Sequence, residues 1–149
     1  DNKWGNHSAS ASGRLNLSAG ELEELDAGYR FNDPSRGRGF AADYAYRAEE
    51  ERHSLSMTAD EKFGSVYARF GQKLDLTPQG LASETSAHGA MFLNDDIAAI
   101  AGARYQVNDR GDHNVIGEVG LQVKDVPIMF GYDPANEAVS LRLSIPFGR

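Results

Sequence analysis

The four histidines are the side chains best suited to catalysis or metal binding: His7, His53, His88 and His113. No two of them stand at a metal-ligand spacing such as i, i+4, so the sequence indicates no metal site. His53 beside Ser54, and His88 near Ser86, raise a lipid-modifying hydrolase as the weakest functional hypothesis, because a catalytic triad depends on geometry that spacing does not specify. We therefore expect a non-catalytic protein without a cofactor.

Three polar segments invite a ligand-binding interpretation. Asp95-Asp96 and residues 108–112 (NDRGD) concentrate oxygen atoms, but residues 108–112 lack the twelve-residue spacing and closing Glu of a calcium loop, so turn chemistry is predicted. The acidic run 49–52 (EEER) is expected to be a solvated hairpin tip. Residues 36–39 (RGRG) resemble a phosphate loop without the helix that such a loop requires, although their two arginines could contact lipopolysaccharide phosphates.

Composition narrows the class of protein. The chain has 149 residues, no cysteine, and 15 basic against 22 acidic side chains, for a net charge of −7. This excludes a disulfide scaffold and a thiolate zinc site, and it argues against nucleic acid as a partner. The longest apolar run, residues 97–103, is too short for a transmembrane helix, and the polar start at Asp1 predicts no signal peptide. We expect a polar leader over residues 1–13 and one domain over residues 14–149.

An alternation of apolar and polar residues predicts β-strands. It is clearest near the end of the chain, at Val139, Leu141, Leu143, Ile145 and Phe147, and at Val115, Val119, Leu121 and Val123. The same period returns more weakly in residues 25–31, 40–46, 66–70 and 99–107. Shorter runs at 15–17, 55–57, 87–93 and 128–132 raise the total to eight to ten strands. Lys124-Asp125 and residues 108–112 are predicted hairpin turns. The predicted fold is an all-β, closed antiparallel up-and-down barrel.

Helices compete at two places. Ser18 with Glu21 has the spacing of a capping box, and residues 63–74 contain apolar side chains at helical spacing. Gly64 and Gly71 would each cost that second helix about 1 kcal/mol relative to alanine. Strands are therefore favoured in both segments.

A meander of this kind can turn its apolar face inward, as a soluble barrel does, or outward to lipid, as a membrane barrel does. The polar positions carry five arginines and five carboxylates, a balance suited to a confined lumen in which buried charges must pair. They are Arg30, Arg47, Arg69, Arg104 and Arg142, with Glu24, Asp26, Asp43, Glu84 and Glu118.

Glycines and aromatic residues favour the membrane alternative. Glycines on the polar face would make room for long arginine side chains: Gly28, Gly71, Gly102, Gly120 and Gly131. Aromatic residues lie near strand ends, as interfacial girdles do: Tyr29, Phe31, Phe40, Tyr105, Phe130, Tyr132 and Phe147. Against this, alternating charges are ordinary on a soluble sheet, only one Trp is present, and residues 55–59 are too few to span a bilayer.

Four segments resemble small bacterial outer-membrane β-barrel proteins, most nearly the YfaZ-like group: LDAGYRFNDP (25–34), GFAADYAY (39–46), AGARYQVND (101–109) and VSLRLSIPFG (139–148). The resemblance covers most of the chain from about Leu15. It implies a C-terminal aromatic signal for the insertion machinery, which Phe147 matches. No motif of that group assigns a functional residue here.

The sequence therefore predicts a barrel in the outer membrane of a Gram-negative bacterium, with a charged lumen filled by side chains. Its expected partners are outer-membrane lipids, lipopolysaccharide and the barrel-insertion machinery, and its expected role is structural, adhesive or that of a narrow channel. The alternative is a soluble periplasmic or secreted β-barrel or sandwich that binds an apolar ligand or assembles with partners.

Overall fold

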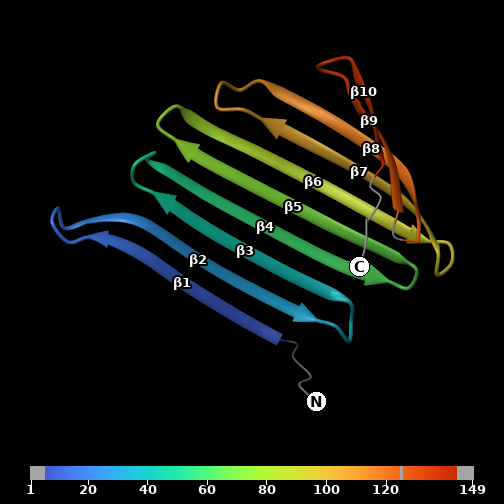
Figure 1. Cartoon of the computed structure of the whole chain (residues 1–149), viewed down its shortest axis with the longest axis horizontal. Helices are drawn as coiled ribbons and strands as arrows, with labels where there is room; N and C mark the ends of the chain where they lie inside the picture. The colour runs from blue at the N-terminus through green and yellow to red at the C-terminus, as the bar shows by residue number, and fades with distance from the viewer. Residues whose placement is uncertain (1–5, 125, 144–149) are drawn as a thin grey trace.

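The chain folds into one antiparallel sheet of ten strands, connected in chain order (Figure 1). The computed structural model describes residues 6–124 and 126–143. The strands are β1 (Asn6–Asn16), β2 (Glu21–Asp33), β3 (Arg38–Arg47), β4 (Arg52–Phe63), β5 (Val66–Thr77), β6 (Gly80–Phe92), β7 (Ile97–Val107), β8 (His113–Val123), β9 (Val126–Asp133) and β10 (Ala138–Leu143). The predicted all-β meander is confirmed, with the higher of the predicted strand numbers.

The sheet is open in the part of the chain that the structure describes. Strands β1 and β10 are its two edges, and each pairs with a single neighbour. Figure 1 shows β9 and β10 crossing at a steep angle to β1–β6, so the sheet is strongly twisted. The ten-stranded meander is thus observed, whereas the predicted closure into a barrel is not.

Both helical alternatives are wrong. Residues 63–74 form the end of β4, a turn and most of β5, with Gly64 in the turn at a φ of 59°. The side chain of Asn16, rather than Ser18, organises the first hairpin, since its Oδ1 accepts hydrogen bonds from the backbone N–H groups of Ser18 and Ala19. Cross-strand pairing with neighbours on both sides outweighs the local helical spacing.

The boundary predicted between residues 13 and 14 falls inside β1. Residues 6–13, which the sequence assigns to a polar leader, pair with β2, from Asn6 opposite Asn32 to Gly13 opposite Leu25. Serine and alanine alternate in this strand, and both are too small for the alternation to stand out in the sequence. The first strand of the sheet therefore begins within the predicted leader.

The hairpin turns lie where the sequence predicts them. Lys124 has a φ of 55° between β8 and β9, and its predicted turn partner Asp125 lies outside the described residues. In the 108–112 loop, Asn108 Oδ1 accepts hydrogen bonds from the backbone N–H groups of Arg110 and Asp112. This is the turn chemistry expected of that segment. The acidic run likewise occupies the β3–β4 turn, and Arg52 begins β4.

The register places most of the large apolar side chains on one face, called here the apolar face, and most of the charged side chains on the other, called the charged face. The charged exceptions on the apolar face include Asp33, Arg38 and Glu61, which lie at or near strand ends. One row of paired residues on the apolar face runs across the sheet: His7, Phe31, Phe40, Ala59, Phe70, Ala87, Ala103, Gly117, Tyr132 and Val139. Because side chains alternate between faces, each strand contributes to both.

The strands are also staggered along the sheet. The distance from this row to the turns at one end of the sheet changes along the sheet. In β2, Phe31 lies ten residues from Glu21, the residue after the β1–β2 turn, whereas in β9 Tyr132 lies one residue from the last residue before the β9–β10 turn. At the opposite end of the sheet, the turns shift relative to the same row, in the same direction. The β8–β9 turn lies four residues farther from the row than the β2–β3 turn does. With about 3.3 Å per residue and about 4.8 Å between strands, these shifts correspond to a strand tilt of about 25–40°.

No helix among the described residues has the length and apolarity needed to span a membrane.

Candidate functional site: the charged face of the sheet

All ten charged residues singled out in the sequence lie on the charged face, and eight of them pair with one another. Arg47 Nη2 lies 2.9 Å from Asp26 Oδ1, Arg104 Nε lies 3.5 Å from Glu84 Oε1, and Arg30 Nη2 lies 3.8 Å from Asp43 Oδ1. The fourth pair joins Arg142 to Glu118. Each pair joins neighbouring strands, except that Arg142 reaches across β9 to Glu118 on β8.

The remaining two charges have partners that the sequence reasoning missed. Arg69 lies 3.8 Å from Asp60, and Glu24 lies 3.6 Å from Arg14. Asp60 stands directly opposite Arg69, and Arg14 directly opposite Glu24. Extending the alternation to β1 and to the end of β4 would have identified both partners.

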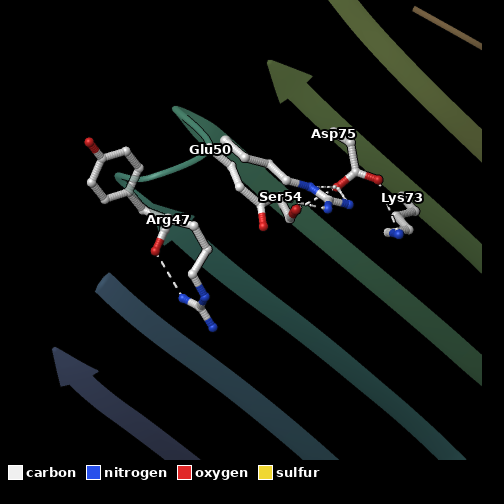
Figure 2. Close-up of polar contacts among 7 residues, drawn as sticks. Arg47, Glu50, Ser54, Lys73 and Asp75 are labelled. Atoms are coloured by element: carbon white, nitrogen blue, oxygen red, sulfur yellow. Dashed lines mark hydrogen bonds and ion pairs between the residues drawn. The ribbon is translucent and has the colours of Figure 1, made fainter. Parts of the chain in front are cut away.

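A second group of charges was also missed, and it centres on Asp75 (Figure 2). Asp75 Oδ1 accepts hydrogen bonds from Arg52 Nη2 at 3.0 Å and from the Ser54 hydroxyl, while Lys73 Nζ lies 3.1 Å from its Oδ2. Glu50, in the β3–β4 turn, lies 3.5 Å from Arg52. Asp75 belongs to β5 and Arg52 to β4, so only the register brings these two side chains together.

In β8, exposure is inverted relative to a soluble sheet. On the apolar face, Val119 is 60% exposed and Leu141 is 66% exposed, and on the charged face the Glu118 side chain is only 17% exposed, although the guanidinium side chain of its partner Arg142 is 66% exposed. Along the whole of β8 the apolar-face positions are exposed and the charged-face positions are half-buried. Among the described residues, Ala98 is the only buried hydrophobic residue. The isolated sheet therefore has no apolar core of its own.

On the charged face, neighbouring atoms occupy the space that a side chain would take at several glycines. A Cβ added at Gly102 would lie 2.5 Å from His88 Nδ1, and one at Gly71 would lie 2.7 Å from Ser86 Oγ. At Gly120 it would meet the backbone oxygen of Ile128. On the apolar face, a Cβ at Gly117 would meet nothing within 4 Å. The charged face is therefore the crowded one.

Most aromatic residues and most histidines lie on the apolar face, whereas Tyr67 and Phe92 lie on the charged face. The predicted girdle residues Tyr29, Phe31, Phe40, Tyr105, Phe130 and Tyr132 are all on the apolar face, while Phe147 lies outside the described residues. His53 Nδ1 lies 2.8 Å from the Tyr44 hydroxyl, and His113 packs against Tyr105. His53 and Ser54 point to opposite faces because they are adjacent in β4. His88 is the histidine of the charged face.

The two arginines that could contact lipopolysaccharide phosphates both pair with the same carboxylate. Arg36 and Arg38 lie 3.9 and 3.5 Å from Asp33 Oδ2, and the Asp33 side chain is almost fully buried. Ser35 also donates a hydrogen bond to Asp33. These contacts close the β2–β3 turn.

No family model, curated protein or solved structure matches this chain. The likeness to the YfaZ-like group stays a prediction.

Proposed function

We propose that this chain is a small outer-membrane β-barrel whose apolar face contacts lipid and whose charged face lines a lumen filled by side chains. Its role is structural, adhesive or that of a narrow channel, without catalysis. The observation that supports this most directly is the exposure of many large apolar side chains on one face, together with paired charges on the other, more crowded face.

Water is a poor solvent for such a sheet. Each large apolar side chain left exposed forgoes roughly 1.5–3 kcal/mol of burial free energy, and the apolar face carries many of them. A bilayer provides that burial without a second protein layer. The paired charges meanwhile satisfy one another in a confined space, as a narrow lumen requires.

The stagger supports closure of β1 against β10. Closed barrels have strands tilted by about 35–45°, a range that overlaps the tilt of this sheet. If the barrel closes, β1 pairs with β10 in a register displaced by the total stagger of the strands. A stagger of about eight residues places Gly13 of β1 opposite Leu141 of β10, and a stagger of about ten places it opposite Leu143. Closure also removes the two unpaired edges, which are otherwise templates for aggregation.

Ten strands enclose a narrow interior. Eight-stranded barrels are just wide enough for their own side chains, and aqueous porins need about sixteen strands. The ion pairs of the charged face would occupy the interior of a ten-stranded barrel. Because the proposed location is the outer membrane, the proposed partners are membrane lipids, lipopolysaccharide and the insertion machinery.

Fractionation and cross-linking test the proposal. We expect the native protein to sediment with outer membranes and to need detergent in solution. Because the chain has no cysteine, Gly13→Cys can be combined with Leu141→Cys or Leu143→Cys, and one pair should form a disulfide. Ala42→Cys with Leu143→Cys is the control that should not. A monodisperse protein in detergent-free buffer would refute the membrane proposal, and failure of both pairs would refute closure.

One observation favours the soluble alternative. A hollow of about 1430 Å³ lies mainly over the apolar face, with Ala87, Ala101 and Ala103 among its small residues and Phe70 and Phe130 among its large ones. An apolar ligand or a second sheet could cover it. In that case the purified protein would be soluble, and its apolar face would be protected without lipid.

A further inference from the structure

The charged face contains a partly enclosed pocket of about 220 Å³ among β6, β7, β8 and β10. Its lining includes His88, Gly102, Arg104, Ile116, Glu118 and Arg142. Gly102 is needed here, because a Cβ at this position would lie 2.5 Å from His88 Nδ1. The imidazole therefore lies over β7 beside the pocket.

The pocket has more positive than negative groups. Arg104 and Arg142 both line it, and Glu118 is its one carboxylate. Glu118 is already paired with Arg142. Arg104 Nε is buried and makes no hydrogen bond to any described residue, with Glu84 Oε1 3.5 Å away as its ion-pair partner. This buried nitrogen of a lining residue therefore has an ion-pair partner but no hydrogen bond, and buried donors usually have one.

We propose that this pocket binds a small oxyanion of the phosphate class, held by Arg104, Arg142 and His88. Guanidinium groups match the oxygens of a phosphate with paired, charge-assisted hydrogen bonds. The volume equals that of about seven water molecules, at about 30 Å³ each, so it admits one phosphate group rather than a nucleotide. The site depends on the charged face as observed and does not require that face to line a lumen.

A second pocket on the same face shows that this charge pattern is local. It measures about 260 Å³ and is lined by serines together with Asp26 and Asp43, with no arginine in its lining. An oxyanion would be repelled there. Arg30, which pairs with Asp43, is therefore a matched control for loss of one positive charge outside the proposed site.

Calorimetric titration of the folded chain with inorganic phosphate tests the proposal. We expect saturable binding that weakens about tenfold or more in Arg104→Gln, the effect of losing a hydrogen bond to a charged group. Ile116→Phe, which fills the pocket and keeps every charge, should abolish binding. Arg30→Gln should bind as the wild type does. Equal loss in Arg30→Gln, or no binding by the wild type, would overturn the proposal.

Nuclear magnetic resonance on the wild type tests the site even if the variants fail to fold. Phosphate should shift the backbone amide resonances of Gly102 and Arg104 and leave that of Gly28 unchanged; shifts confined to other regions would contradict the site. Phosphorylethanolamine, a headgroup without acyl chains, distinguishes two sources of the ligand. Weaker binding than that of phosphate assigns the pocket to the free ion, and tighter binding assigns it to a headgroup.

Discussion

Replacing glycines by alanine measures which face of the sheet is crowded. At Gly120 the added Cβ would clash with the Ile128 backbone oxygen and lie 2.6 Å from Met129 Sδ, so β9 itself must move. At Gly102 it would displace the His88 ring. Overpacking of this kind costs about 1–3 kcal/mol, and we expect Gly120→Ala at the upper end because backbone cannot rotate away.

Gly117 is the matched control on the apolar face. It lies in β8, three residues from Gly120, and an added Cβ meets nothing within 4 Å. Alanine there should stabilise the protein by about 0.4–1 kcal/mol, because it reduces the freedom of the unfolded chain. At Gly71 and Gly131 the obstructing atom is a serine hydroxyl that can rotate, so the cost should fall between these limits.

Urea denaturation in a fixed detergent or lipid, followed by far-ultraviolet circular dichroism, gives these differences as free energies of unfolding. The expected order of stability is Gly117→Ala above wild type, then Gly71→Ala, Gly102→Ala and Gly120→Ala. If Gly117→Ala destabilised the protein as much as Gly102→Ala, the two faces would be equally packed and the reasoning would fail. An unchanged m-value is needed for each comparison.

The two faces and the strand number lead to three more expected outcomes. Val119→Arg or Leu141→Arg should cost about 2–4 kcal/mol in bilayers if these positions meet lipid, measured by unfolding from vesicles; no cost would place them away from the hydrocarbon. Glu118→Ala should destabilise by about 1–2 kcal/mol, because it removes a largely buried carboxylate that accepts a hydrogen bond from Arg142, and exposed Glu50→Ala by less than about 0.5 kcal/mol; equal effects would show that Glu118 is not confined. Purified protein in planar bilayers should show at most small or flickering currents, and porin-like conductance from a folded monomer would show an open lumen.

Local patterning was enough to predict the strands and their faces. The period of two in residues 139–143 and 115–123 specifies which side chains share a face, because alternation in a strand is geometric. For the same reason Arg30, Arg104 and Glu84 could be assigned to one face before any pairing was known. The turns at 108–112 and at Lys124 follow from the local chemistry of Asn and the positive φ of a tight hairpin.

Pairing partners required the register between strands. Asp75 meets Arg52 only because β4 and β5 align as they do, and a shift of one residue would send those two side chains to opposite faces. The Arg142–Glu118 contact likewise requires the register, because it joins β10 to β8 across the intervening strand β9.

Residue types and their period of two were sufficient to predict the all-β class, the two faces and the balance of charges. The start of β1 at Asn6, the count of ten strands, and the contrast between a crowded charged face and an exposed apolar face emerged only from the folded sheet. The crowding of a face depends on the twist and stagger of many strands together, and the residue pattern within one strand does not determine these.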